Sequence, residues 1–599
     1  MIAIRESVVP VATCFFFLLF RLVSHATATD HHQHKRDPLD SPNFVLFFVD
    51  DLGYGDLGFN GHPTTSTPNI DRLAWNGKIL TTWYSGCSVC SCSRAALMTG
   101  RQYTRTGVRE VFSPVAKLGL PLEEVTVAEQ LKKANYTTAI VGKWHLGQRL
   151  TYLPGSQGFD YYLGIPYSDD MGNGQRGACP SAEGEQTGAY NDEDVEPPEK
   201  KSPRPPQDND YASWYVPLVY QEHNKTRIVE QPLNFNTLAH KYNHFATKFI
   251  EDNKNDPFLL YFPFSHVHTT TSTNENWEEM PNSQYSSCEI RNVTKRGAFG
   301  DALAEVDWMV GNVYDALKRS GLEENTLILF TSDNGPWTPK GSDAGSYGIF
   351  SGKYAGYPWT GKASTWEGGI RMPAFAYWKG QIEPLSRSSE TISSMDVFPT
   401  FSRLANVSLP ADTVLDGRDM SDILLREEGV SKHDFLFFYG FCNGAWPRSG
   451  ITAVRHGPYK AHFCTKPGFG GNGKAKRYDN YPLLFNVEMD PSETFPICEG
   501  ETLPKNDPEA RAAIHRIQRA YAMEKATFEY GDVPNILPGR GEGPHHYGLC
   551  CDREKHCNCE SIWDHEFQSR LFNVGSAAHH SKYHGILGEE NHMENHEEV

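Results

Sequence analysis

The chain has 599 residues, of which 39% are apolar and 22% are charged, a composition typical of globular proteins. Its formal net charge is −18, and no dense run of lysine or arginine offsets it, which argues against nucleic acid as a partner. A chain of this length has room for more than one domain.

The N-terminal segment has the pattern of a secretory signal peptide. Arg5 precedes an apolar stretch over residues 8–22, and Ala26-Thr27-Ala28 offers a cleavage site of small residues. An uncleaved anchor is the alternative, but Arg21 interrupts the stretch, which is short for a bilayer span. Residues 1–28 are therefore predicted to be removed, and no later apolar run is long enough to cross a membrane.

Four Asn-x-Ser/Thr sequons and thirteen cysteines agree with secretion. The sequons predict glycosylation at Asn135, Asn224, Asn292 and Asn406. Cys14 lies in the signal segment and Cys90 is assigned to chemistry below, so eleven cysteines remain for disulfides. Because eleven is odd, at least one thiol is predicted to stay free or to pair between chains. The expected location is the secretory pathway, leading to the lysosome or the cell exterior.

Four short apolar runs are each followed by polar residues that are able to do chemistry. The runs cover residues 44–49, 137–141, 258–262 and 327–330, and they lead into Asp50-Asp51, Lys143-Trp144-His145, His266 with His268, and Asp333-Asn334 respectively. Continuous apolar runs of this length are typical of strands buried on both faces, as in a parallel sheet.

Helical segments alternate with these runs. Thr67-Pro68 is typical of a helix start and Gly77 of its end, and Thr126 and Glu129 have the spacing of a capping box. Alternating strands and helices predict an α/β fold with helices on both faces of the sheet. Ligands of such folds collect beyond the carboxyl ends of the strands, so the four polar turns are predicted to form one site.

The remaining chain divides by composition. Residues 180–210 are rich in Pro, Glu, Asp and Lys, which predicts a long surface insertion in a main domain over residues 42–432. Short strand candidates follow over residues 433–538, which predicts a smaller antiparallel subdomain. Residues 539–599 form a polar tail in which Cys550, Cys551, Cys557 and Cys559 are expected to make disulfides.

The most specific motif starts at Cys90 and reads Cys-Ser-Cys-Ser-Arg-Ala-Ala-Leu-Met-Thr-Gly-Arg. It resembles the sulfatase signature, in which Cys-x-Pro-Ser-Arg is followed by a helix that ends in Thr-Gly-Arg. The departure is Cys92, which stands where proline is usual. The resemblance implies that the formylglycine-generating enzyme oxidises Cys90 to formylglycine, whose hydrated aldehyde is the nucleophile. The alternative is that Cys87, Cys90 and Cys92 form a disulfide or zinc cluster.

Hard oxygen ligands follow two of the predicted strands. Asp50 and Asp51 lie in Val-Asp-Asp-Leu-Gly-Tyr-Gly-Asp, and Asp333 and Asn334 lie in Ser-Asp-Asn-Gly-Pro. Such ligands suit calcium or magnesium. Both segments also resemble the metal-binding segments of sulfatases, which implies one bound Ca²⁺, with Mg²⁺ as the alternative, and the modified Cys90 as a further ligand. Asp56, nearby in the first segment, is interpreted as structural.

Further resemblances supply the groups that hold and cleave a sulfate ester. Gly-Lys143-Trp-His145-Leu-Gly and the segment around Lys362 are similar to family motifs, and so is the position of Ser168. The resemblance implies that Lys143, Ser168 and Lys362 bind the sulfate and that Arg94 anchors the modified side chain. It implies that Asp333 is a base and that His268, beside Lys362, protonates the leaving alcohol. His145 is implied to remove a proton in the second step. His266 is interpreted as a packing residue.

The resemblance covers about residues 43–497 and is closest to the arylsulfatase A type of the family. It implies an alkaline-phosphatase-like fold, with a large, mostly parallel mixed sheet between helices and a smaller C-terminal antiparallel sheet. The implied activity is hydrolysis of the sulfate ester of a small molecule, glycolipid or glycan, and the resemblance allows a homo-oligomer. One alternative is a phosphate or phosphonate ester hydrolase on the same fold. The other is a secreted glycan-binding glycoprotein without catalysis, if Cys90 is not converted.

Overall fold

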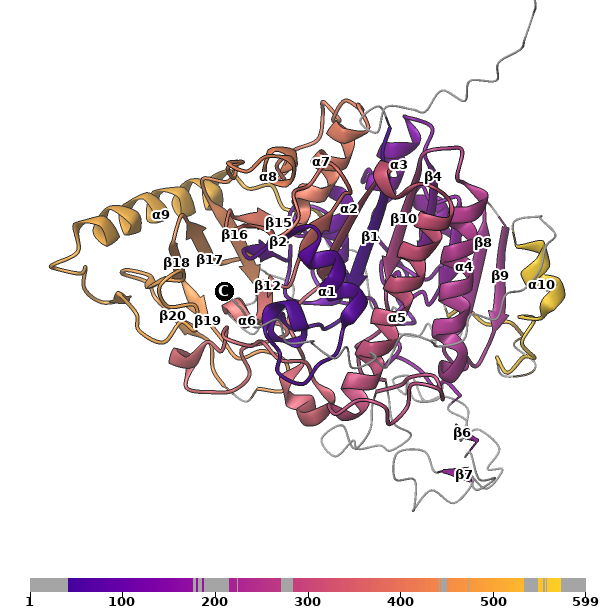
Figure 1. Ribbon diagram of the computed structural model, residues 1–599. Helices are drawn as coiled ribbons and strands as arrows, with labels where there is room; N and C mark the ends of the chain where they lie inside the picture. Colours follow the sequence, from indigo (N-terminus) through magenta and orange to yellow (C-terminus); the bar gives the residue numbers. More distant parts are fainter. Residues whose placement is uncertain are drawn as a thin grey trace, which may run out of the picture. The chain divides into compact units, whose positions relative to one another are not determined.

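A ten-stranded mixed sheet organises the computed structural model of the chain (Figure 1). The structure describes residues 41–175, 179–180, 186–187, 215–223, 225–270, 284–440, 442, 450–471, 473–532, 548–552, 555 and 557–571. The predicted signal peptide, Asn224, most of the 180–210 insertion and the end of the tail lie outside these residues.

The centre of the sheet is parallel, antiparallel pairs flank it on both sides, and the pair at one edge is parallel again. Strand β1 lies between β11 and β10, and β4 and β5 continue the parallel part beyond β10. In order across the sheet, the strands are β14 (Ser386–Ser388), β2 (Lys78–Leu80), β13 (Phe375–Tyr377), β11 (Thr326–Ser332), β1 (Asn43–Val49), β10 (Phe258–Pro263), β4 (Thr137–Val141), β5 (Tyr161–Gly164), β8 (Leu218–Glu222) and β9 (Lys225–Glu230).

Both faces of this sheet are covered by helices, because the central strands alternate their side chains between two apolar cores. In β1, Val45, Phe47 and Val49 belong to one core, whereas Phe44 and Phe48 belong to the other. The first core packs under α1 (Pro68–Trp75), α4 (Leu238–Asp252) and α5 (Gly297–Arg319), and the second under α2 (Cys90–Thr99), α3 (Val127–Lys132), α7 (Val397–Leu404) and α8 (Ser421–Leu425). Figure 1 shows α4 and α5 side by side on one face.

A second, five-stranded antiparallel sheet follows in the C-terminal part of the chain. Helix α9 (Pro508–Thr527) packs on it and contributes Ala513, Ile514 and Ile517 to a third apolar core (Figure 1). The strands in order are β16 (Leu436–Gly440), β17 (Gly450–His456), β18 (Tyr459–His462), β21 (Leu483–Asn486) and β22 (Cys498–Glu499).

Smaller elements complete the described chain. They are β3 (Trp83–Tyr84), β12 (Arg371–Met372) and β15 (Ile392–Ser393) in a three-stranded sheet, the pairs β6 (Cys179–Pro180) with β7 (Gln186–Thr187) and β19 (Cys464–Thr465) with β20 (Lys476–Arg477), and the short helices α6 (Glu367–Ile370) and α10 (His565–Arg570). Among the described helices, none has the length and apolar character needed to cross a bilayer.

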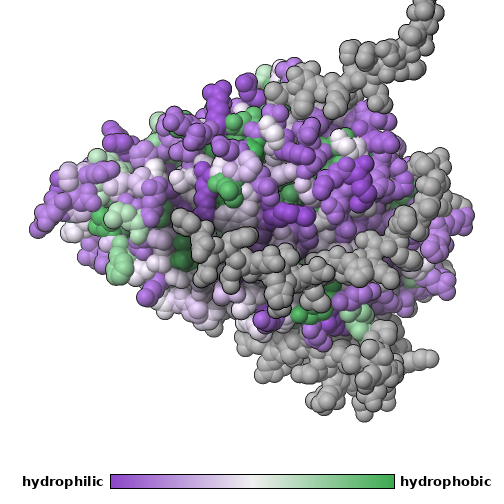
Figure 2. All heavy atoms as spheres, in the orientation of Figure 1, coloured by the Kyte–Doolittle hydropathy of each residue, from purple (hydrophilic) through white to green (hydrophobic). Residues whose placement is uncertain are grey.

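The architecture confirms the fold predicted from the sequence. The four apolar runs form β1, β4, β10 and β11, and the predicted C-terminal strands form β16, β17, β18 and β21. The capping box at α3 is present, because Thr126 accepts from the Glu129 backbone N–H and the Glu129 carboxylate accepts from the Thr126 N–H. On the face shown in Figure 2 hydrophilic residues predominate, with hydrophobic ones scattered between them.

Five disulfide bonds stabilise the described part of the chain, as the cysteine content predicted. They join Cys87 to Cys92, Cys179 to Cys288, Cys442 to Cys464, Cys550 to Cys557 and Cys551 to Cys559. Cys90 and Cys498 remain free and buried, so the expected odd thiol besides Cys90 is Cys498. Disulfides persist in oxidising compartments, and five of them indicate a chain that folds in the secretory pathway.

Candidate active site

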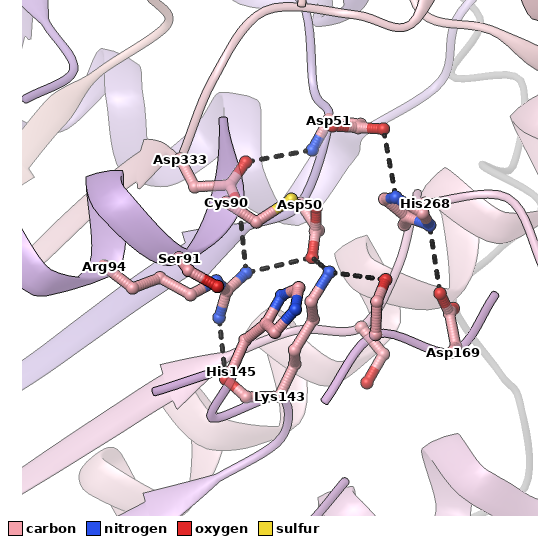
Figure 3. Close-up of polar contacts among 12 residues, drawn as sticks. Asp50, Asp51, Cys90, Ser91, Arg94, Lys143, His145, Asp169, His268 and Asp333 are labelled. Atoms are coloured by element: carbon pink, nitrogen blue, oxygen red, sulfur yellow. Dashed lines mark hydrogen bonds and ion pairs between the residues drawn. The ribbon is translucent and has the colours of Figure 1, made fainter. Parts of the chain in front are cut away.

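The polar turns predicted to form one site follow four neighbouring parallel strands. Asp50 comes directly after β1 and Asp333 after β11, while Lys143 and His268 follow β4 and β10 by two and five residues. Because β11, β1, β10 and β4 are adjacent and parallel, these turns meet at one edge of the sheet, and Figure 3 shows their side chains converging. The structure therefore brings the predicted residues together.

Cys90 enters this cluster from the N-terminal end of α2. All ten residues of α2 are buried, and the Cys90 thiol lies 3.6 Å from Asp50 Oδ1. A helix N-terminus carries partial positive charge and favours anions in front of it. The sequence left open whether Cys87, Cys90 and Cys92 form one cluster, and here the disulfide joins Cys87 to Cys92 and leaves Cys90 free.

Asp50 is the centre of a buried ionic network. Its Oδ2 lies 2.5 Å from Lys143 Nζ and 3.0 Å from Arg94 Nη2. The same Arg94 nitrogen lies 3.0 Å from Asp333 Oδ2, and Arg94 Nη1 donates to the Lys143 carbonyl at 2.6 Å. Arg94 thus joins the turns after β1, β11 and β4, and its guanidinium plane is suited to such bridging.

Burial and neighbouring charges shift the pKa values of these groups in different directions. Burial by itself would raise the pKa of Asp50, but Lys143 and Arg94 outweigh it and hold this pKa far below its ordinary value. Burial and the neighbouring Asp50 raise the pKa of Asp333 to about 7. Burial and Asp50 also raise the pKa of the Cys90 thiol well above its ordinary value. An unmodified Cys90 is therefore protonated at physiological pH and a weak nucleophile.

A second set of contacts surrounds Asp51. Lys362 Nζ lies 2.7 Å from Asp51 Oδ1 and 3.0 Å from His268 Nε2, and the Asn334 amide nitrogen donates to Asp51 Oδ1 at 2.7 Å. Single ligand atoms of Asp50, Asp51, Cys90 and His268 all lie within 4.8 Å of one another, so this cluster has the spacing of a metal site.

The donor set fits a hard cation. Asn334 is fully buried, and within the described residues its Oδ1 accepts no hydrogen bond. A buried oxygen without a donor is costly unless something else satisfies it, and a cation does so. In addition, the carboxylates of Asp50, Asp51 and Asp333 are balanced here by the three cations of Arg94, Lys143 and Lys362.

Two histidines flank the cluster, and both are held neutral. Burial, together with Lys362 and Lys143, lowers the pKa of His268 well below its ordinary value. Burial, Lys143 and Arg94 do the same for His145. His145 Nε2 lies 3.0 Å from the Phe112 carbonyl, so Nε2 carries the proton, and Nδ1 has no hydrogen-bond partner among the described residues. His145 therefore presents a buried proton acceptor.

The backbone at two of these residues is in the left-handed region. Asp51 has φ 57° and His145 has φ 58°. Residues other than glycine are rare there, and such strain of about 1–3 kcal/mol persists where the surrounding structure imposes it, commonly at functional sites. Here the Asp51 N–H donates to Asp333 Oδ1 at 3.2 Å, and the Asp51 side chain is fixed by Asn334 and Lys362.

Among the other residues named from the sequence, Ser168 belongs to the site, whereas His266 and Asp56 do not. Lys143 Nζ donates to Ser168 Oγ at 2.9 Å. His266 lies 2.9 Å from Glu305 in the interior, and Asp56 pairs with Arg296 at 2.6 Å, in line with their interpretation as structural residues. Sequence reasoning missed Asp169, a fully buried carboxylate whose Oδ1 lies 3.0 Å from His268 Nδ1. Its position directly after Ser168 was the available signal.

Comparisons with known proteins agree on one family. The family model described as "Sulfatase" matches residues 42–407, and the one described as "C-terminal region of aryl-sulfatase" matches residues 431–559. Arylsulfatase G of Canis lupus familiaris is 36% identical over 523 residues, which cover 85% of this chain and 91% of that protein. Arylsulfatase A of Homo sapiens is 36% identical over 540 residues, which cover 86% and 95%. The crystal structure of PsFucS1 sulfatase from Pseudoalteromonas sp. superposes with a TM-score of 0.63 at 27% identity, covering 82% of this chain and 92% of that one.

Proposed function

The chain belongs to the sulfatase family and is an arylsulfatase-like sulfuric ester hydrolase, and from this premise we propose that it cleaves sulfate esters with a formylglycine made from Cys90 and one bound divalent cation. The products are inorganic sulfate and an alcohol. The observation that carries the proposal is the position of Cys90, buried at the start of α2 within contact of Asp50 and inside the cluster with metal-site spacing.

The electrostatics of its surroundings support the conversion of Cys90. Burial and Asp50 keep the thiol protonated, so cysteine itself gives this site no reactive nucleophile. Formylglycine supplies, when hydrated, a hydroxyl nucleophile together with a second hydroxyl that releases the bound sulfate. The formylglycine-generating enzyme is accordingly a partner during maturation, and it must accept the Cys92 residue in place of proline.

The cation is held by Asp50, Asp51, Asp333 and Asn334 together with the modified residue 90. These oxygen donors favour Ca²⁺, with Mg²⁺ as the alternative. The ion supplies Lewis acidity, which polarises sulfate oxygens and acidifies a neighbouring hydroxyl. Lys143 and Lys362 now contact Asp50 and Asp51, and a cation at these carboxylates leaves both ammonium groups to bind the sulfate.

Removal of the cation is expected to abolish activity reversibly. Dialysis against a chelator should remove turnover, and Ca²⁺ should restore it. In calorimetric titrations, Asn334→Ala should weaken calcium binding by more than about tenfold, because even indirect contacts of a metal site are worth roughly 10–100-fold in affinity.

Asn43→Ala is the matched control, because Asn43 is also a buried asparagine but hydrogen-bonds to Phe258 and Thr326 away from the site. Equal calcium affinity of wild type and Asn334→Ala would show that Asn334 is no ligand. Full activity of the chelated protein would contradict the role of the cation.

The remaining groups divide between charge stabilisation and proton transfer. Lys143, Ser168 and Lys362 hold the sulfate oxygens and stabilise the charge that develops on them. His268, with Lys362 Nζ 3.0 Å from its Nε2, protonates the departing alcohol. His145 accepts a proton at Nδ1 from the side chain at position 90 in the second half of the reaction. Asp333 is the base in the first half, and Arg94 anchors residue 90 and the two carboxylates beside it.

Sulfate rather than phosphate is the expected substrate group. With the sulfate and phosphate monoesters of one phenol, kcat/KM should be higher for the sulfate ester. The relatives that the chain matches are named arylsulfatases, which supports the sulfate ester as the substrate. Faster hydrolysis of the phosphate ester would instead favour a phosphoester hydrolase on the same fold.

We extend the proposal to the compartment and the domains. Asn135, Asn292 and Asn406 are exposed and are proposed as glycosylation sites, together with Asn224, which lies outside the described residues. A fall in mass after N-glycosidase treatment of the secreted protein tests this. The mature protein is proposed to act in the lysosome or outside the cell on a sulfated small molecule, glycolipid or glycan. Residues 42–432 form its catalytic domain, 433–538 its C-terminal subdomain and 539–599 its tail.

A further inference from the structure

A cavity of about 440 Å³ lies beside the nucleophile and is not used by any step described above. Ser88 and Val89, which line it, directly precede Cys90, and Ala363, which also lines it, directly follows Lys362. The Ala363 N–H donates to the Ser88 carbonyl at 2.7 Å, which fixes these two walls to each other. The volume lies within the range of roughly 300–1,000 Å³ that small-molecule sites occupy.

The cavity lies on the side of the proposed proton donor. The ring of Trp337 lies 5.8 Å from the ring of His268, and Lys362 Nζ lies 5.0 Å from the Trp337 centroid. The ring of Trp337 also lies 6.2 Å from the ring of Phe469, which lines the cavity. The Phe469 N–H also donates to the Lys362 carbonyl at 3.1 Å. Trp337 and Phe469 thus connect the proposed proton donor to the wall of the cavity.

The lining is mainly apolar and aromatic. Val89, Val111, Tyr103, Tyr439 and Phe469 are among its lining residues, and Tyr439 and its neighbour Gly440 come from β16 of the C-terminal sheet. Apolar walls favour apolar rings, because burial of such surface is favourable and requires no hydrogen bond. A sugar carries a hydroxyl on most of its carbons, and each would need a polar partner when buried.

Arg109, Glu110 and Lys466 are the acidic and basic side chains that line the cavity. Burial raises the pKa of Glu110 to about 7, although Lys466 acts in the opposite direction. Burial also lowers the pKa of Lys466, which Glu110 partly offsets. These side chains can accommodate a polar substituent on an otherwise apolar ligand.

We propose that this cavity binds the alcohol part of the substrate and that this alcohol is an apolar ring system, of the phenol or steroid kind, rather than a sugar; the inference rests on the proposed sulfatase function. The C-terminal sheet then has a direct part in substrate selection, because β16 and β17 contribute Tyr439, Gly440 and Thr452 to the walls.

The test compares three sulfate esters and two variants of the converted enzyme. The substrates are 4-nitrophenyl sulfate, the 3-sulfate of a steroid whose A ring is not aromatic, and glucose 3-sulfate, of which the last two both release a secondary alcohol of ordinary reactivity. Val111→Trp adds volume to the cavity wall. Val430→Trp makes the same change at a residue that is 66% exposed and does not line the cavity.

The wild type should hydrolyse the steroid ester with a higher kcat/KM than the sugar ester. 4-Nitrophenyl sulfate is compared only between variants, because its activated leaving group makes it react fast whatever the fit of the cavity. Val111→Trp should lower kcat/KM for the apolar esters by at least about tenfold, since one methylene group in an apolar pocket is worth roughly 10–200-fold. Val430→Trp should change nothing.

Product inhibition gives a second readout that needs no variant. The free steroid should inhibit hydrolysis of 4-nitrophenyl sulfate competitively, whereas glucose should not. Preferred hydrolysis of the sugar ester, or equal losses for all three esters in Val111→Trp, would overturn the inference and leave the sulfatase function standing. Failure to hydrolyse any of the three esters, with Cys90 converted, would instead contradict the proposed function itself.

Discussion

Replacement of Cys90 by serine is expected to end turnover and leave protein that carries one covalent sulfate group. Serine places a single hydroxyl at the start of α2, among the groups proposed to bind sulfate. Attack on sulfur then gives a sulfate ester with no neighbouring hydroxyl to expel it. The loss in kcat should exceed about 1,000-fold, as for removal of other nucleophiles that act within a catalytic unit. Intact mass after incubation with substrate measures the bound group.

Two variants control this experiment. Cys90→Ala should be inactive and should gain no mass, because it offers no hydroxyl. Cys498→Ser changes the other free and buried cysteine of the described residues and should retain activity. Sustained turnover by Cys90→Ser would contradict the two-hydroxyl chemistry proposed for residue 90.

Replacement of Lys143 by methionine is expected to lower kcat by about 100- to 1,000-fold, the range found when one preorganised charge-stabilising donor is removed. The Lys143 side chain is fully buried between Asp50 and Ser168. Its loss removes a cation from the sulfate site and leaves Asp50 paired with Arg94 alone. Loss of one partner of a buried ion pair also costs about 3–5 kcal/mol of stability, so activity and thermal unfolding must both be measured.

Lys241→Met separates these two effects. Lys241 is a buried lysine that pairs with Glu230 at 2.6 Å, and neither residue belongs to the site. Both variants should melt at a lower temperature than the wild type, but only Lys143→Met should lose activity per folded molecule. Equal specific activities of the two variants would remove Lys143 from the proposed sulfate site.

The sequence was most informative where local pattern determines structure. The apolar runs of β1 and β11 predicted buried strands, and Thr126 with Glu129 predicted the start of α3, because burial on both faces and helix capping depend on neighbouring residues. Convergence of Asp50, Asp333 and Lys143 also followed, since the ends of adjacent parallel strands meet at one edge of a sheet. The roles of Lys362 and Ser168 depended on resemblance, because a single lysine or serine has no distinguishing pattern.

Features that depend on contacts between residues far apart in the sequence could not be predicted from it. Disulfide partners are not encoded in cysteine spacing, so the bond between Cys87 and Cys92 that leaves Cys90 free appeared only in the structure. Asp169 becomes significant only because β5 carries it to His268, which follows β10. The apolar cavity likewise combines the segment before α2 with β16 and β17 from the C-terminal sheet.

The disulfide also explains in structural terms why a cysteine at position 92 is compatible with this segment. At the position where the family signature has proline, which restricts the backbone, Cys92 is joined to Cys87 across the residue to be modified. Proline and the disulfide both limit the conformations of this segment, so the departure from the signature is compatible with a fixed position of Cys90 in the folded protein.

The most direct test of the account is mass spectrometry of the tryptic peptide of residues 79–94 from protein secreted by eukaryotic cells. After reduction and alkylation, Cys87 and Cys92 should both carry the alkyl group. Cys90 should carry none and should show the mass change for loss of H₂S and gain of one oxygen atom. That result would establish the nucleophile in a segment that has Cys92 in place of proline. Three alkylated cysteines in this peptide, in protein that has passed through the secretory pathway, would contradict the proposed catalytic mechanism.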